Sequence, residues 1–152
     1  MKRRSVQTRF GSLVVTEEQD AVTRLEWDEG TAYHDVSAVL DEAVVQLLGY
    51  DAGTLTAFAL PMRIGGSDTL RAVCAEISAI PFGDTLTYGD IARKLGVPAQ
   101  VVGQACGLNP IPVIVPCHRV MGAKGLTGYS GVGGIETKVA LLRHEGAAGI
   151  LI

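Results

Sequence analysis

The chain has 152 residues, of which 47% are hydrophobic, and its mean hydropathy is +0.28. This composition excludes a disordered chain, and the length suits one domain or two small lobes. The formal net charge of −3 excludes the strongly basic composition of many nucleic-acid-binding proteins. No apolar run approaches the roughly 20 residues of a membrane span. The basic N-terminus MKRRSVQTRF lacks the apolar stretch of a signal peptide, so we expect a cytoplasmic protein with no membrane partner.

The N-terminal part alternates apolar and polar residues before a helical pattern begins. GSLVV (11–15) and AVTRLEW (21–27) are separated by the polar turn TEEQD, which predicts a β-hairpin. A helix is predicted over 35–50, followed by a further strand over 54–62 and a linker, RIGGSD. Gly49 and Gly53 are expected to end the helix. Its apolar residues at helical spacing are Val36, Val39, Leu40, Val44, Leu47 and Leu48.

The C-terminal part is mainly helical in pattern. A helix over 67–80 is capped by Ser67 or Asp68, and two short helices, TYGDIARKLG and PAQVVGQACGL, flank a glycine-containing turn. Such a pair fits a helix-turn-helix, although most helix pairs of this kind simply pack. A glycine-rich loop and a last helix, IETKVALLRHEGA, follow. The charge changes sign between the two parts, from −4 over 1–65 to +1 over 66–152.

These patterns predict an α/β (α+β) fold with two parts. Residues 1–65 form a small lobe with an antiparallel sheet and a helix, which we expect to be structural. Residues 66–152 form a mainly helical lobe with a winged helix-turn-helix-like motif.

The three cysteines are Cys74, Cys106 and Cys117. The odd number, without an export signal, argues against a disulfide framework. There is no CxxC pair or Cys/His cluster at zinc spacing, so we expect no metal site. Cys74 and Cys106 lie on apolar helical faces and are interpreted as core residues.

Cys117 lies in a different setting, VIVPCHRV, where an apolar run meets Pro116 and is followed by His118. A cysteine attacks as its thiolate, which an imidazole can generate and a carboxylate such as Glu145 can support. Adjacent side chains on a strand point to opposite faces. Contact between Cys117 and His118 therefore requires a bend at Pro116 or a bridging water.

The segment PCHRV resembles the active-site motif of the O6-alkylguanine-DNA alkyltransferases, the methylated-DNA–protein-cysteine methyltransferases. IPFGDTLTYGDIA, GLNPIPVIVPCHRV, GLTGYSG and LLRHEG resemble that family in the same order, over roughly residues 67–146. The resemblance implies direct-reversal DNA repair without a cofactor. Double-stranded alkylated DNA would bind a monomer through its minor groove, and a flipped O6-alkylguanine, or O4-alkylthymine, would give its alkyl group irreversibly to Cys117.

The resemblance also implies roles for further residues. His118 would take the thiol proton through a water, and Glu145 would orient His118. Tyr88 would donate to the base, and Asn109 would brace the turn before the cysteine. The substrate pocket would include Tyr129, Ser130 and Val120, and the DNA-binding residues would be Gln100, Val101, Gly103 and Arg119.

One departure from the family concerns the recognition helix, which usually carries an arginine that replaces the flipped base. The run PAQVVGQACG is about two residues shorter and contains no arginine, and Gln100 lies nearest that place. We expect weaker DNA binding with a smaller salt dependence. Two alternatives therefore stay open, namely a lesion-binding protein without transfer activity and, with less support, a thiol enzyme or redox sensor.

Overall fold

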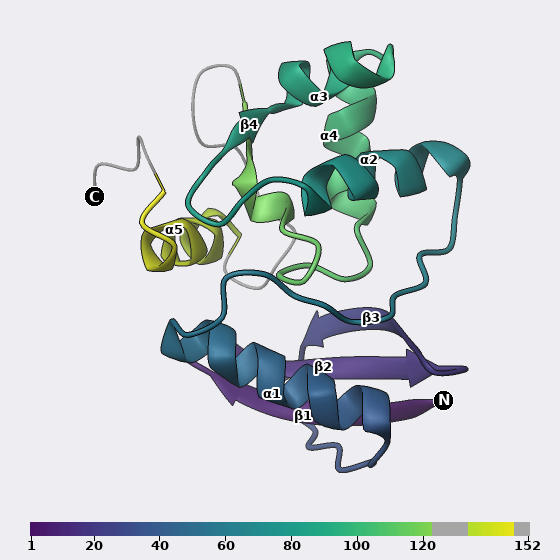
Figure 1. Ribbon diagram of the computed structural model, residues 1–152, viewed down its shortest axis with the longest axis vertical. Helices are drawn as coiled ribbons and strands as arrows, with labels where there is room; N and C mark the ends of the chain where they lie inside the picture. Colours follow the sequence, from purple (N-terminus) through teal and green to yellow (C-terminus); the bar gives the residue numbers. More distant parts are fainter. Residues whose placement is uncertain (123–133, 148–152) are drawn as a thin grey trace. The chain divides into compact units, whose positions relative to one another are not determined.

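The structure is a computed structural model that describes residues 1–122 and 134–147, and the chain divides into two compact units, Met1–Gly65 and Gly66–Ile152. In the first unit, β1 (Lys2–Thr8), β2 (Gly11–Glu18) and β3 (Ala21–Trp27) form an antiparallel sheet in the order β1-β2-β3 (Figure 1). The predicted hairpin is confirmed as β2 and β3. Sequence reasoning missed β1 because only Val6 of this polar run is buried.

Helix α1 (Ala38–Ala52) packs against this sheet and begins later than predicted, because the Ser37 side chain accepts from the Leu40 N–H as the N-cap. Gly49 lies inside the helix, and Gly53, at φ +79°, forms the C-cap. Of the apolar residues at helical spacing, Val36 and Leu48 do not lie on the buried face, since they are 64% and 45% exposed. The buried residues are Leu40, Ala43, Gln46, Leu47 and Tyr50.

The strand predicted over 54–62 is absent from the described elements. Only Met62 forms a bridge, to Val22, whose backbone N–H donates to Pro61 O at 2.8 Å. Pro61 has no N–H and cannot extend a ladder, so the pairing stops at one bridge.

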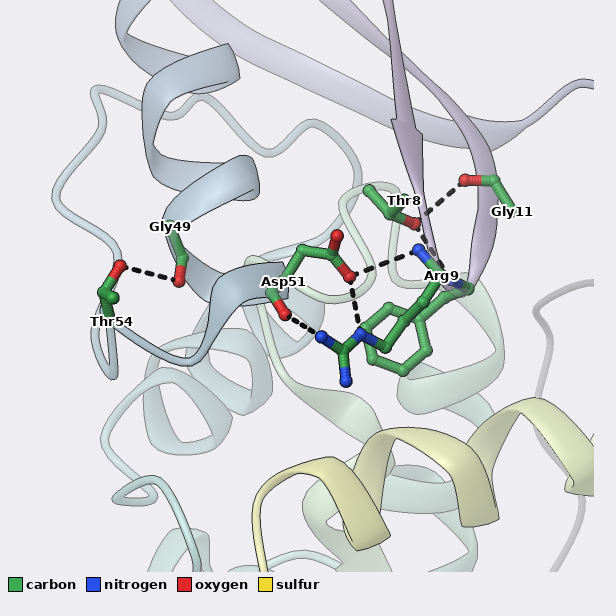
Figure 2. Close-up of polar contacts among 7 residues, drawn as sticks. Thr8, Arg9, Gly11, Gly49, Asp51 and Thr54 are labelled. Atoms are coloured by element: carbon green, nitrogen blue, oxygen red, sulfur yellow. Dashed lines mark hydrogen bonds and ion pairs between the residues drawn. The ribbon is translucent and has the colours of Figure 1, made fainter.

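The turn between β1 and β2 is fixed to the end of α1 by Arg9 (Figure 2). Its backbone N–H and Nε both donate to Asp51 Oδ1, at 3.2 and 3.0 Å, and Nη2 donates to Asp51 O at 2.7 Å. The Thr8 hydroxyl donates to Gly11 O within the same turn. The Arg9 side chain is 57% exposed, so this ion pair contributes at most about 1 kcal/mol.

The second unit contains α2 (Asp68–Ser78), α3 (Tyr88–Leu95), α4 (Ala99–Leu108) and α5 (Ile135–His144). The short strands β4 (Leu86–Thr87) and β5 (Val120–Met121) pair in parallel. Ser67 is the N-cap of α2, and Gly96, at φ +70°, ends α3 before Pro98 opens α4. The predicted α/β class and the four helices of this part are confirmed. The glycine-rich loop lies largely at 123–133, outside the described residues.

Candidate active site

Cys117 begins a 3₁₀ turn, Cys117–Arg119, and not the strand predicted from the apolar run. Pro116 precedes the turn at φ −81° and ψ 64°, and it cannot donate a ladder hydrogen bond. Instead, the Cys117 N–H donates to Val115 O at 2.8 Å and the Arg119 N–H donates to Pro116 O at 2.9 Å. Neighbouring side chains therefore do not alternate between the faces of a sheet. The Cys117 side chain ends in the interior of the unit, 4% exposed.

His118 is fully buried and pairs with Glu145, the residue that caps the end of α5. The distance from His118 Nε2 to Glu145 Oε2 is 2.6 Å. Burial lowers the pKa of His118, and the hydrogen bond to Glu145 raises it by a smaller amount. The imidazole is therefore neutral at pH 7, and its Nε2–H donates to the carboxylate. His118 Nδ1 is left as an acceptor, buried and without a hydrogen-bond partner among residues 1–122 and 134–147.

The structure corrects the prediction for Arg119, which was expected to contact DNA. Arg119 is only 5% exposed, and its Nε and Nη2 donate to the two carboxylate oxygens of Glu145, at 2.8 and 3.2 Å. Its Nη1 donates to Ile80 O at 2.6 Å. A guanidinium buried in these contacts cannot reach a phosphate. Its charge instead neutralises Glu145 and fixes the carboxylate against His118.

Asn109 holds the loop that leads from α4 to the cysteine. Its Nδ2 donates to Val115 O at 2.9 Å, and its Oδ1 accepts from the Ile111 N–H at 3.0 Å. The loop between them contains Val113 at φ +73°, a rare conformation for a β-branched residue. One buried amide thus satisfies two backbone groups that neither helix nor sheet pairs.

Tyr88 is half-buried and is the first residue of α3, directly after the N-cap Thr87. Thr87 and Asp90 form a capping box, with hydrogen bonds of 3.0 and 2.9 Å. Thr87 also belongs to β4, which pairs with β5 beyond the cysteine turn. The position of Tyr88 is therefore tied to that of the cysteine turn through the β4–β5 pair.

The remaining predicted site residues differ in how far they are exposed. Gln100 is exposed on α4, with Val101 and Gly103 half-buried beside it, whereas Val120 is fully buried in β5. Helix α4 carries no charged residue. Tyr129 and Ser130 lie outside the described residues. Among the described residues, no cluster of His, Cys, Asp or Glu could hold a metal ion, and no helix is long and apolar enough to cross a membrane.

Sequence reasoning missed Lys138, which is 1% exposed on α5 and donates from Nζ to Val120 O at 2.7 Å. The helical spacing could have predicted its burial, because Lys138 precedes Leu141, Leu142 and Glu145 at intervals of three, four and seven. A lysine on the buried face of a helix needs a reason to be there.

The other two cysteines are also buried. Burial raises the pKa of Cys74 to about 11 and that of Cys106 to about 12. The negative charge of an ionised Cys117 is the second cause of both increases. At neutral pH, Cys74 and Cys106 are therefore thiols, and they behave as the core residues that the sequence predicted.

Known proteins similar to this chain agree with one another. The family model described as "6-O-methylguanine DNA methyltransferase, DNA binding domain" matches residues 68–147. A methylated-DNA–protein-cysteine methyltransferase of Mycobacterium leprae is 38% identical over 93% of this chain and 90% of its own length. One from Mycolicibacterium paratuberculosis is 48% identical over 68% of this chain, and the aligned residues span 63% of that relative.

The fold is also similar to that of a solved structure. The crystal structure of Mycobacterium tuberculosis OGT in complex with DNA has a TM-score of 0.86 and 39% identity, covering 99% of this chain and 98% of that one. The matched domain contains both the cysteine turn and the buried His118–Glu145 pair. This chain therefore belongs to the methylated-DNA–protein-cysteine methyltransferase family.

Proposed function

We propose that this protein repairs DNA by direct reversal, transferring the alkyl group of O6-alkylguanine to Cys117 in a single turnover. The observation that carries the proposal is the buried pair of His118 and Glu145, which leaves His118 Nδ1 as an acceptor. His118 directly follows Cys117 in the chain. Family membership supports the same conclusion.

In the proposed reaction, His118 Nδ1 accepts the thiol proton of Cys117 through a bridging water. Glu145 stabilises the imidazolium that forms, because its carboxylate accepts the Nε2–H at 2.6 Å. The thiolate then attacks the alkyl carbon, forming an S–C bond while the C–O6 bond breaks. The bonding electron pair goes to the departing guanine, whose developing negative charge is stabilised by hydrogen-bond donors. We assign that donation to Tyr88 and Ser130, with Tyr129 and Val120 completing the pocket.

We further propose that a monomer binds the minor groove through α3 and α4, with Gln100, Val101 and Gly103 at the contact. Asn109 keeps the cysteine turn in register with α4 by its bonds to Ile111 and Val115. Residues 1–65 serve as a structural domain and residues 66–152 as the alkyltransferase domain. The cytoplasm remains the predicted location.

The deciding experiment incubates the protein with duplex DNA that carries O6-methylguanine and locates the mass change by peptide mapping. One added methylene on the peptide that contains Cys117 is the expected result, and Cys117→Ala should abolish transfer while keeping much of the DNA affinity. If stoichiometric protein at low salt never becomes methylated, the proposal is wrong. Lesion binding without transfer would then identify a lesion binder, and absence of both would identify a thiol protein that acts elsewhere.

A further inference from the structure

Helix α4 carries two exposed amides on the side that faces away from the core. Val102, Ala105 and Cys106 are the buried residues of this helix. Gln100 and Gln104 lie one turn apart on the opposite side, and both are exposed. Because the helix contains no charged residue, this side offers a partner two amides and no ion.

Neither amide is used within the described part of the chain. The amide of Gln46, by contrast, donates to Ala59 O at 3.0 Å and accepts from the Ala59 N–H at 2.9 Å. The side chains of Gln100 and Gln104 make no hydrogen bond to any residue among 1–122 and 134–147. An unused amide can bind an outside group that both donates and accepts, because it has an NH₂ and a carbonyl oxygen.

Two glycines leave the helix backbone uncovered beside Gln104. Among the described residues, no atom lies within 4 Å of the position that a Cβ would take on Gly103 or Gly107. Packing in this part of the chain therefore does not require either glycine, although each costs a helix about 1 kcal/mol relative to alanine. A partner can approach the backbone at these two positions without meeting a side chain. Gln104 follows Gly103 directly and precedes Gly107 by three residues, so its amide would lie against such a partner.

The minor groove of DNA contains one base that matches both groups of an amide. A·T pairs present only acceptors in this groove, whereas guanine adds the donor N2 amino group. A glutamine can therefore make two hydrogen bonds to guanine, donating to N3 and accepting from N2–H. At an A·T pair, the same side chain can only donate.

We propose that Gln104 is a specificity-determining residue that recognises the N2 amino group of a guanine close to the lesion. This inference rests on the proposed function, because it takes α4 as the helix that enters the minor groove. At 1.5 Å per residue, Gln104 lies about 6 Å along the helix from Gln100, and base pairs are about 3.4 Å apart. With Gln100 at the place left by the flipped base, Gln104 reaches a base pair one or two steps away.

The test compares duplexes that carry O6-methylguanine and differ in one guanine beside it. Guanine at each of the two nearest positions on either side is replaced in turn by inosine, which lacks the N2 amino group but keeps N3. Dissociation constants are measured by fluorescence anisotropy with Cys117→Ala, in which methyl transfer cannot interfere. Methyl transfer itself is measured separately, with the wild-type protein and the guanine duplex.

Inosine should weaken binding by about tenfold at one of the four positions, the effect of losing one bidentate contact. Gln104→Ala and Gln104→Met, each added to Cys117→Ala, should bind the guanine and inosine duplexes equally. The methionine keeps the length of the side chain and removes its amide. Gln7→Ala is the matched control and should keep the tenfold difference, because Gln7 is exposed on β1 and its amide bonds to Ser12.

Equal binding of guanine and inosine at all four positions overturns the inference. A difference that persists in Gln104→Ala also overturns it, and its loss in Gln100→Ala would then assign the recognition to the other amide. The two proposals fail separately. Methyl transfer without a guanine preference contradicts only the role of Gln104, and a guanine preference without methyl transfer contradicts only the repair function.

Discussion

Replacing Asn109 by alanine should destabilise the protein by about 3 kcal/mol. The substitution leaves the buried Ile111 N–H without its hydrogen-bond partner, which costs about 1–3 kcal/mol. Val115 O loses one of its two donors and keeps the Cys117 N–H at 2.8 Å, so its cost is smaller, about 1 kcal/mol. The two costs together give the expected value.

Urea unfolding followed by circular dichroism measures this change. With a denaturant slope of about 2 kcal/mol/M, the midpoint should fall by about 1.5 M. Gln104→Ala is a suitable control, because Gln104 is an exposed amide on α4 and should change stability by less than about 0.5 kcal/mol. A loss below about 1 kcal/mol for Asn109→Ala, at an unchanged slope, would show that the loop finds other partners and that the amide does not brace it.

Three further predictions concern the buried pair and the start of α3. Glu145→Gln should slow alkyl transfer and cost about 3–5 kcal/mol of stability in urea unfolding, because it leaves the buried Arg119 uncompensated; equal stability would contradict the ion pair. Thr87→Ala should lower the free energy of unfolding by about 1 kcal/mol, because it removes the N-cap of α3, and the melting temperature should fall accordingly. An unchanged melting temperature would mean that the cap does not stabilise the protein. Burial lowers the pKa of His118 below its ordinary 6.5, so the imidazole binds a proton more readily in the unfolded chain than in the folded chain. Stability should therefore fall as the pH decreases from about 6.5, in calorimetry, with a weaker slope in His118→Gln; equal slopes would exclude His118 as the cause.

Local patterns were sufficient to predict most of the secondary structure. The sequence left Ser67 and Asp68 as alternative caps of α2, and the structure has Ser67 as the N-cap. The prediction that Gly96 ends α3 is confirmed. The run VIVP was interpreted as a strand because its residues are apolar and β-branched. It forms a loop instead, since Asn109 satisfies the backbone groups that a sheet would otherwise pair. A side chain several residues away decided the conformation.

The candidate site was predictable only in part, for a related reason. Cys117, His118 and Glu145 could be named from the family resemblance, but Arg119 could not be interpreted correctly from the residues beside it. Its partners, Glu145 and Ile80, lie 26 and 39 residues away in the sequence. In a linear sequence, a buried arginine and an exposed arginine look alike, and only the fold distinguishes an ion pair from a DNA contact.

The same distinction changes the meaning of the charge in the C-terminal unit. Its sequence charge of +1 suggests a weak attraction for DNA, yet Arg119 and Lys138 are buried. The cations of α2 and α3 pair with acidic neighbours, namely Arg71 with Asp68, Arg93 with Asp90 and Lys94 with Glu76. Helix α4 has no charge. Most of the positive charge among the described residues of this unit is therefore buried or paired. The proposed DNA contact accordingly relies more on shape and on the amide of Gln100 than on phosphate attraction.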